Sequence, residues 1–514
     1  MIKRIPLFAF LLLSVCTYAQ KKDKFAKKIA ATITAADMKK HLYTIASAEM
    51  EGRDTPSPGL EKAAEYIEAH FKSLGLLPGN KDSYRQYYPL YKDSMTGAGM
   101  VINGQNFELD KDFQPQTSNY PAEMRFSEVV FAGYGISDGD NRDDYKDLNV
   151  AGKLVMIIDG TPTGYKPSQS GFRSPASSFG KMNAAMKNGA AAILFVYNNF
   201  PRRAFNSNSN WSMNSYRSTQ MPLAFTISPN IAAKIMNEDS KVLADKMKEG
   251  SLEPKAYDAE VDLSYSKTTQ VTKVSNVLGL LEGTDLKDEY VVLTAHYDHV
   301  GKRSNGDIYY GADDDGSGTT GILELAEAFA EAKKAGKGPR RSILFMTVSG
   351  EEKGLWGSHY YSEHPVYPLE KTTVDLNIDM IGRIGTEYLK SKDSTNYTYI
   401  IGDDKLSSDL ATITDQVNST YTKLKLDRKY NDPNDPNRFY FRSDHYNFAQ
   451  KGVPIIFYFN GTHADYHRPT DTPDKINYPL MAKRAQLVFY TAMEMANRND
   501  MLKRDIKLEV PRGF

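Results

Sequence analysis

Acidic and histidine side chains gather in one stretch of this 514-residue chain. His296 and Asp298 follow an apolar run, and Asp313, Asp314 and Asp315 come after a polar loop. Carboxylates this close together repel one another strongly unless a cation neutralises them. A combination of imidazole and carboxylate ligands suits zinc best among the common metals. A DDD run alone is equally explained by a solvated acidic turn, but the nearby His296 and Asp298 favour a metal site.

Four apolar runs have the composition of strands buried on both faces, and each leads to a histidine or a carboxylate. The runs are Tyr290–Ala295, Ser342–Val348, Thr373–Ile378 and Pro454–Phe459. The side chains that follow the last three runs are Glu351, Glu352, Asp379, His463, Tyr466 and His467. In open α/β sheets, ligands bind just beyond the carboxyl ends of the strands. We therefore expect these side chains to meet at one edge of a sheet.

Five motifs carry a resemblance to a known family. In chain order they are H-x-D, GADDDGSG, GEEKGLWGS, NIDMIG and YHRPTD, and they span His296 to Asp471. Together they resemble the co-catalytic zinc aminopeptidases, a family that includes bacterial leucyl aminopeptidases and, more distantly, glutamate carboxypeptidases. The resemblance implies an α/β fold with a mixed, largely parallel sheet flanked by helices. It also implies an exopeptidase, most simply an aminopeptidase acting on peptides, with two Zn²⁺ per chain.

The resemblance further implies a metal ligand set. His296 and Asp379 would hold one zinc ion, Glu352 and His467 would hold the other, and Asp314 would bridge the two. The peptide bond after Asp314 is expected to be cis, as in relatives. Two zinc ions roughly 3.5–4 Å apart can share a water molecule, lower its pKa and polarise a carbonyl group.

Catalytic roles follow from the same motifs. Glu351 resembles the general base of the family, which takes a proton from water and passes it to the leaving amine. Asp298 resembles the carboxylate that orients His296 through its other ring nitrogen. Tyr466 resembles a tyrosine that donates a hydrogen bond to the oxyanion in some relatives, and His445 is an alternative donor. Either of the last two could equally be a packed pocket residue.

Two rival functions stay open at this stage. A carboxypeptidase of the glutamate type needs cationic side chains for the free carboxylate of its substrate. The candidates for that role are Arg383, Arg438, Arg442 and Arg468. A binding protein that kept the fold and lost catalysis is less well supported, because all the ligand and base positions are filled.

The composition of the chain points away from several classes of protein. Lys and Arg number 64, as do Asp and Glu, so no nucleic acid or acidic partner is indicated.

Residues 1–19 read as a signal peptide, with Lys3 and Arg4 before the apolar run Ile5–Val15. We therefore expect a periplasmic or extracellular protein, without a lipid anchor at Cys16 because valine precedes that cysteine. No later run is long enough for a transmembrane helix.

The remaining sequence suggests an interrupted peptidase domain. We expect its N-terminal part over residues 20–120 and its zinc-binding part over residues 256–514. Helical spacing marks Ala35–Ala48, Gly59–Leu74 and Tyr478–Ala496. Residues 121–255 resemble an inserted protease-associated domain without metal-type clusters. Within that insert, Phe200–Met221 is expected to be a surface loop.

Overall fold

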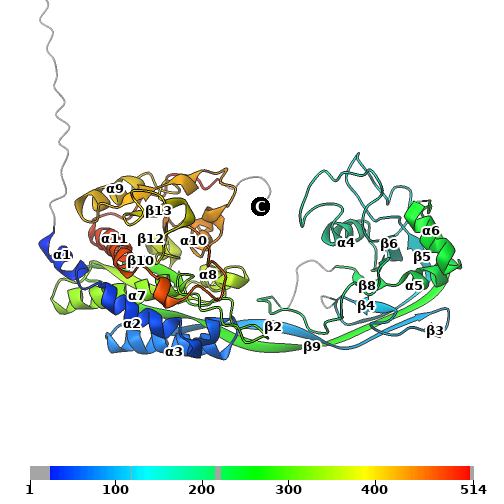
Figure 1. Ribbon diagram of the computed structural model, residues 1–514, viewed down its shortest axis with the longest axis horizontal. Helices are drawn as coiled ribbons and strands as arrows, with labels where there is room; N and C mark the ends of the chain where they lie inside the picture. The colour runs from blue at the N-terminus through cyan, green and yellow to red at the C-terminus, as the bar shows by residue number, and fades with distance from the viewer. Residues whose placement is uncertain (1–22, 117–118, 215–220, 250, 510–514) are drawn as a thin grey trace, which may run out of the picture. The chain divides into compact units, whose positions relative to one another are not determined.

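The computed structural model describes residues 23–116, 119–214, 221–249 and 251–509. The predicted signal peptide and Cys16 lie outside this part of the chain. The described residues form two compact units (Figure 1). Unit 1 contains the chain up to Tyr88 and from Val274 onwards, and unit 2 is Pro89–Lys273.

A mixed sheet runs through unit 1, in the strand order β14-β13-β15-β12-β10-β11-β9. Its central strands are parallel, β10 with β11 and β12, and β12 with β15. Strand β9 pairs antiparallel with β11, and β13 pairs antiparallel with β15. The strand bounds are β9 Lys255–Leu281, β10 Leu286–His296, β11 Arg341–Val348, β12 Thr372–Ile378, β13 Tyr397–Ile401, β14 Lys425–Asp427 and β15 Ile455–Phe459, with β1 (Leu77–Pro78) beside β9. All four predicted strands are confirmed, as is the mixed, largely parallel sheet.

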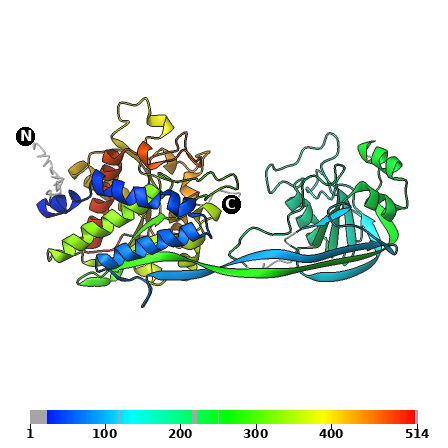
Figure 2. The same ribbon diagram turned by 60° about the horizontal axis from the view of Figure 1, so that its bottom comes forward.

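Helices cover both faces of this sheet. Phe329 of α7 lies against Phe345 of β11, whereas Tyr361 of α8 shares a core with the next strand residue, Met346. Because successive strand residues point to opposite faces, α7 and α8 cover opposite faces. The helices that pack together with α7 are α1, α2, α3 and α11 (Figure 2). The helix bounds are α1 Lys24–Ala30, α2 Ala35–Ile45, α3 Pro58–Ser73, α7 Gly316–Lys334, α8 Trp356–Glu363, α9 Leu410–Thr420, α10 His445–Gln450 and α11 Tyr478–Asn497.

The first predicted helix ends earlier than expected, at Ile45 rather than Ala48. The chain continues as a kinked 3₁₀ segment, Ala48–Arg53, in which Glu51 and Gly52 have positive φ angles of 50° and 70°. The helix ends because Ala46, its C-cap, leaves helical geometry with φ −100° and ψ 32°. The left-handed residues further on keep the 3₁₀ segment from continuing as a right-handed helix. Further 3₁₀ segments cover Glu351–Lys353, Leu369–Lys371, Thr386–Tyr388, Lys429–Asn431, Phe439–Phe441 and Pro473–Lys475.

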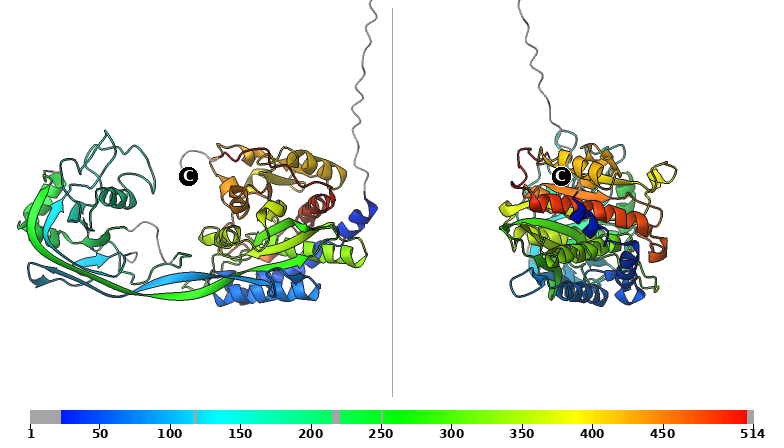
Figure 3. Two further views of the ribbon diagram at one scale, coloured as in Figure 1. Left: turned by 180° about the vertical axis from the view of Figure 1, so that it is seen from behind. Right: turned by 90° about the vertical axis from the view of Figure 1, so that its left-hand side faces the viewer.

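Unit 2 is a smaller α/β unit. Strands β5 to β8 are parallel, and helix α4 covers one face of them while α5 and α6 cover the other (Figures 1 and 3). The bounds are β2 Arg85–Ile102, β3 Gln105–Asn106, β4 Phe113–Pro115, β5 Ala122–Phe131, β6 Leu154–Ile158, β7 Ala192–Val196, β8 Leu223–Ile227, α4 Ser178–Lys187, α5 Pro229–Met236 and α6 Ser240–Glu249.

The boundaries of unit 2 differ from the predicted insert over residues 121–255. Met100 and Phe113 on one side, and Val261 and Leu263 on the other, share a core with strands β5 to β8. The long strands β2 and β9 therefore belong partly to this unit and continue into unit 1. A continuous strand gives no composition change at the point where a domain ends, so the sequence did not reveal this boundary.

Two other expectations concern a surface loop and membrane-spanning helices. The predicted loop Phe200–Met221 contributes short bridges from Asn208 to Ser94 and from Ser212 to Tyr91, both within unit 2. Residues 215–220 of this loop lie outside the described part of the chain. Among the described helices, none has both the length and the apolar composition required to cross a membrane.

Candidate metal centre

The predicted site residues converge at the carboxyl edge of the unit 1 sheet. His296 is the last residue of β10, and Asp379 directly follows β12. Glu351 and Glu352 lie in the 3₁₀ turn after β11, and His467 lies in the loop after β15. Parallel strands place all these ends at the same edge of the sheet.

Asp314 lies between two groups of these side chains. The first group is His296, Asp379 and Glu351, and the second group is His467 and Glu352. The Oδ1 atom of Asp314 is 3.3 Å from His296 Nε2, which in turn is 3.6 Å from Asp379 Oδ1 and 3.9 Å from Glu351 Oε2. Its Oδ2 atom is 2.9 Å from His467 Nε2, which is 3.1 Å from Glu352 Oε1. One carboxylate thus offers one oxygen to each group.

His299 is a member of the second group that sequence reasoning missed. Its Nδ1 atom lies 2.9 Å from Glu352 Oε1 and 3.9 Å from Asp314 Oδ2, and its side chain is fully buried. Neither of its ring nitrogens has a hydrogen-bond partner among the described residues. The available signal was its place three residues after His296, in the same loop.

The donor chemistry of this cluster fits metal ions. Ligands bound at about 2.0–2.2 Å to a tetrahedral zinc ion are separated from one another by roughly 3.3–3.6 Å, close to the separations given above. His296 Nε2, Asp314 Oδ2 and Glu352 Oε1 are buried and make no hydrogen bond within the described structure. Buried polar atoms without partners are costly, and a cation that accepts their lone pairs removes that cost.

The electrostatics of the cluster lead to the same conclusion. Burial lowers the pKa of His467, but Asp314 and Glu352 outweigh it and raise that pKa to about 10. Burial raises the pKa of Glu351 well above its usual value, and His296 only partly opposes this effect. Crowded carboxylates thus draw protons onto the neighbouring histidines or keep them on one another. A bound divalent ion would take the place of these protons.

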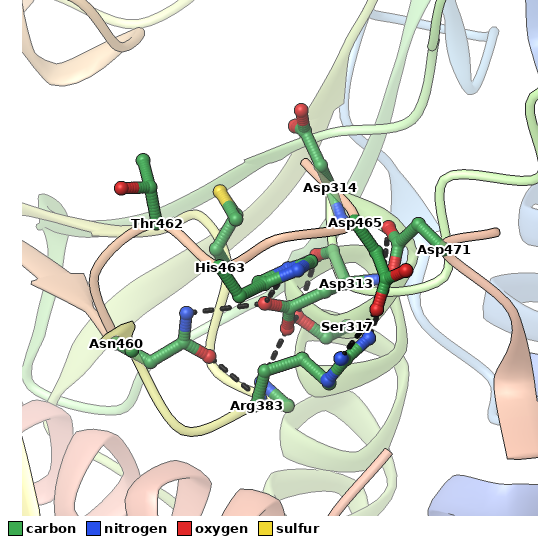
Figure 4. A network of polar contacts seen from close by, with 12 residues as sticks. Asp313, Asp314, Ser317, Arg383, Asn460, Thr462, His463, Asp465 and Asp471 are labelled. Atoms are coloured by element: carbon green, nitrogen blue, oxygen red, sulfur yellow. Dashed lines mark hydrogen bonds and ion pairs between the residues drawn. The ribbon is translucent and has the colours of Figure 1, made fainter. Parts of the chain in front are cut away.

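The three consecutive aspartates have three different roles. Asp313 is the centre of a polar network beside the site (Figure 4). Its Oδ1 accepts from the backbone N–H of Gly382 at 2.6 Å, and its Oδ2 accepts from Asn460 Nδ2 and is 3.1 Å from His463 Nε2. Asp315 caps helix α7 by accepting from Gly318 N at 2.8 Å. Among the three aspartates, only Asp314 lies between His296 of the first group and His467 of the second group.

A second carboxylate fixes the backbone of this loop. Asp471 Oδ2 accepts hydrogen bonds from the backbone N–H groups of Asp313 and Asp314, at 2.9 and 3.3 Å (Figure 4). Arg383 pairs with Asp471 at 3.5 Å and with Asp465 at 2.7 Å. The peptide bond between Asp314 and Asp315 is cis, as expected.

Asp298 contacts the site in two ways. Its backbone carbonyl oxygen lies 3.1 Å from His296 Nδ1, whereas its carboxylate Oδ1 lies 3.7 Å from the same nitrogen. The carboxylate accepts from the backbone N–H of Glu351 at 3.1 Å. The nearest acceptor for the second ring nitrogen of His296 is therefore the carbonyl group, and the carboxylate links the loops that follow β10 and β11.

The two candidate oxyanion donors lie in different environments. The ring of Tyr466 stacks on His467 with 4.0 Å between centroids, and its hydroxyl oxygen accepts a hydrogen bond from Arg442 at 3.4 Å. His445 is fully buried, its Nε2 lies 2.8 Å from the carbonyl oxygen of Tyr440, and its ring stacks on Phe457. Burial lowers the pKa of His445 to about 3. His445 is thus a packed core residue.

Arg53 was not predicted to matter, yet it holds the site loops in place. It is fully buried and donates to the carbonyl oxygens of Tyr297 and Gly311 at 2.7 and 2.9 Å. It also donates to Ile45 O and Tyr310 O, at 2.9 and 2.8 Å. One guanidinium group thereby joins the N-terminal segment to the loops that carry His296 and Asp314.

Comparison with known proteins gives the following similarities. Residues 276–492 match the model of peptidase family M28. Leucine aminopeptidase 2 of Trichophyton rubrum is 25% identical over 481 residues, covering 85% of this chain and 83% of that protein. A probable glutamate carboxypeptidase of Arabidopsis thaliana is 35% identical over 120 residues, which is 23% of this chain and 16% of that protein. An aminopeptidase from Aneurinibacillus sp. strain AM-1 has the same fold, with a TM-score of 0.52 at 19% identity, covering 94% of this chain and 98% of that one.

The role of Arg53 can be tested by the change Arg53→Met. The substitution keeps the aliphatic volume but leaves several buried carbonyl groups without donors, each costing about 1–3 kcal/mol. We expect the apparent free energy of unfolding to fall by at least about 3 kcal/mol, measured by thermal or urea unfolding of the full chain. Arg303→Met is the matched control, because Arg303 is exposed and only covers the Tyr309 ring. A similar stability for the two variants would contradict this role.

Proposed function

This chain belongs to peptidase family M28 and is a zinc metallopeptidase; on that premise we propose that it is an aminopeptidase with two Zn²⁺ in its active site. The observation that carries the proposal is the position of Asp314, with Oδ1 beside His296 and Oδ2 beside His467. A carboxylate placed in this way can bridge two metal ions.

We assign the ligands from the two groups. His296 and Asp379 would hold one ion, Glu352 and His467 the other, and Asp314 both. Ser443 donates to Asp379 Oδ2 at 2.6 Å and so directs the other oxygen, Oδ1, towards His296. His299 lies within reach of the second ion. The bound ions would supply the acidity that activates water and polarises the scissile carbonyl group.

Glu351 is our assignment for the proton carrier. Its backbone is fixed by Asp298, and burial raises the pKa of its carboxyl group well above the usual value. A carboxyl group with a raised pKa accepts a proton from attacking water more readily and can pass it to the leaving amine. Asp298 would act as a positioning residue, through both Glu351 and His296.

Tyr466 is our assignment for an additional oxyanion donor. Its place beside His467 keeps its ring next to the second group of ligands. Its hydroxyl group accepts from Arg442, which leaves its own proton to donate. A donor aimed at the developing oxyanion stabilises the transition state more than the ground state.

Two observations favour an aminopeptidase over a carboxypeptidase. Arg383, one of the four candidate cations for a carboxypeptidase, is paired with Asp465 and Asp471. The leucine aminopeptidase relative aligns along most of this chain, whereas the glutamate carboxypeptidase relative aligns over a short part. A binding protein without activity would need neither a complete ligand set nor Glu351.

The setting of the enzyme is also part of the proposal. The N-terminal sequence supports export to the periplasm or the cell exterior, with cleavage after residue 19. We assign unit 2 as a protease-associated domain with an influence on substrate range or stability. Among its described residues, no group of metal-type side chains is found, so we place no catalytic metal there.

The direction of peptide cleavage is the main test of this function. The purified mature chain should release nitroaniline from leucyl-p-nitroanilide and remove the first residue of C-terminally amidated peptides. It should leave N-acetylated peptides with a free C-terminus intact. Cleavage of the acetylated peptides alone would establish a carboxypeptidase, and no cleavage of either set by zinc-loaded protein would favour a binding protein.

The two adjacent glutamates should behave differently when each is changed to glutamine. Glu351→Gln removes a proton acceptor, so we expect retained zinc and a kcat lower by about 10²–10⁴. Glu352→Gln removes a ligand, so we expect loss of about one zinc ion per chain, measured by elemental analysis after dialysis. The reverse pattern would show that the roles of the pair are exchanged.

The change Tyr466→Phe tests the oxyanion donor. Loss of such a donor elsewhere lowers the rate by about 10²–10³, and we expect an effect near the lower end on kcat with little change in KM. Tyr84→Phe is the control, because Tyr84 is a buried tyrosine that donates to the carbonyl oxygen of Leu76. If kcat of Tyr466→Phe stays within about twofold of wild type, Tyr466 only packs against His467.

A further inference from the structure

A second cluster of metal-type side chains lies in the helical layer of unit 1. It consists of His41 on α2, His70 on α3, and Glu324 and Glu327 on α7. These three helices lie side by side (Figures 1 and 2). His41, His70 and Glu327 each offer one ligand atom, and these atoms lie within 4.8 Å of one another.

The separations within this cluster suit a small metal ion. Glu327 Oε1 is 3.3 Å from His41 Nε2 and 3.3 Å from His70 Nε2, and Glu324 Oε1 is 3.8 Å from His41 Nε2. Ligands of a tetrahedral zinc ion are roughly 3.3–3.6 Å apart when each bond is about 2.0–2.2 Å long. Two imidazoles and two carboxylates also form a donor set that zinc prefers.

Two atoms of the cluster are buried without partners. Glu324 is 1% exposed, and its Oε1 atom has no hydrogen-bond partner in the described part of the chain. The same holds for His70 Nε2, the atom that faces Glu327. The carboxylate oxygen lies 3.8 Å from His41 Nε2 and the imidazole nitrogen lies 3.3 Å from Glu327 Oε1, so each needs either a ligand or an explanation.

The remaining nitrogen of His41 has a partner outside the cluster. Tyr66 Oη lies 2.7 Å from His41 Nδ1. This contact fixes the ring so that Nε2 faces the two glutamates, which is the arrangement of metal-bound histidines whose other nitrogen is hydrogen-bonded.

We propose that His41, His70, Glu327 and Glu324 bind a divalent transition metal, zinc being the expected ion, which cross-links helices α2, α3 and α7. This site is separate from the candidate active site, because Glu327 lies eleven residues into α7 from Gly316, roughly 16 Å along the helix at 1.5 Å per residue. Its role is structural, since its ligands come from three helices, of which α2 and α3 both pack against α7. The proposal does not depend on the direction of peptide cleavage.

The alternative explanation of the cluster is an ion pair without a metal, in which Glu327 Oε1 accepts hydrogen bonds from the ring nitrogens of both histidines. This alternative satisfies Glu327, and it requires the carboxyl group of Glu324, whose pKa burial raises to about 8, to carry a proton at neutral pH. Metal content distinguishes the two readings directly, because an ion pair adds no zinc to the chain.

The first test counts zinc in the mature full-length chain after equilibration with buffered Zn²⁺ and removal of weakly bound ions. We expect Glu327→Gln to hold about one ion fewer per chain than wild type and to keep activity on leucyl-p-nitroanilide at low temperature. Glu331→Gln, which removes the same charge one turn later on the exposed face of α7, should match wild type. Equal zinc in all three proteins would overturn the proposal.

A second test separates this site from the candidate active site and is independent of activity. In the Glu352→Gln background, Zn²⁺ should still raise the melting temperature over that of chelator-treated protein, because binding to the folded state stabilises it. The rise should become smaller when His70→Gln is added, because only the ion held by His296 and Asp379 is then left to stabilise the folded chain. A rise of the same size with and without His70→Gln would overturn the proposal, and failure of Glu352→Gln to lose zinc would count only against the active-site ligand assignment.

Discussion

The concentration of buried negative charge at the carboxyl edge of the unit 1 sheet is the constraint on which the site depends. The carboxylates buried there are Asp298, Asp313, Asp314, Asp315, Asp379 and Asp471. Several have fixed donors, among them Gly382 N for Asp313 and Gly318 N for Asp315. Asp314 Oδ2 has no hydrogen-bond partner among the described residues, and the same is true of Asp298 Oδ2 and Asp315 Oδ2. Asp314 differs from the other two because its carboxylate lies between His296 and His467. A cation at that position would relieve the repulsion among these carboxylates.

The backbone that presents these side chains is equally constrained. Gly350, just before the glutamate pair, has a φ of 76°, and a Cβ placed there would meet Trp356 Cβ at 2.9 Å. Met380 and His467 have φ angles of 60° and 54°, which non-glycine residues rarely adopt. Such conformations persist where the surrounding contacts determine them, and they are common at functional sites. The edge is therefore held by packing and hydrogen bonds among the residues of the chain itself.

Much of this arrangement was readable from the sequence, because short apolar runs followed by charged residues identify buried parallel strands with a site at one edge. What could not be read was the orientation of each side chain. Nothing in the DDD run says that only Asp314 faces the histidines, and His299 falls on a loop with no periodicity to place it. Arg53 was missed because its partners are backbone carbonyl groups, three of which lie 244 to 258 residues away in the chain. Carbonyl groups occur at every residue and leave no signature in the sequence.

The cluster of His41, His70 and the α7 glutamates was also missed, because its members lie far apart in the sequence. The position of this cluster has a consequence for the active site. Helices α2 and α3 flank the segment Ala48–Arg53. An ion that joins both helices to α7 would hold the two ends of the segment that carries Arg53. Arg53 in turn fixes the carbonyl groups of Tyr297 and Gly311, in the loops of His296 and Asp314. Loss of that ion should therefore loosen the frame of the active site rather than remove one of its ligands, because Glu327 lies roughly 16 Å along α7 from Gly316. If both proposals hold, a chelator would inactivate the enzyme in two ways, by removing the catalytic ions and by releasing the helical layer. Metal counts made variant by variant would separate the two.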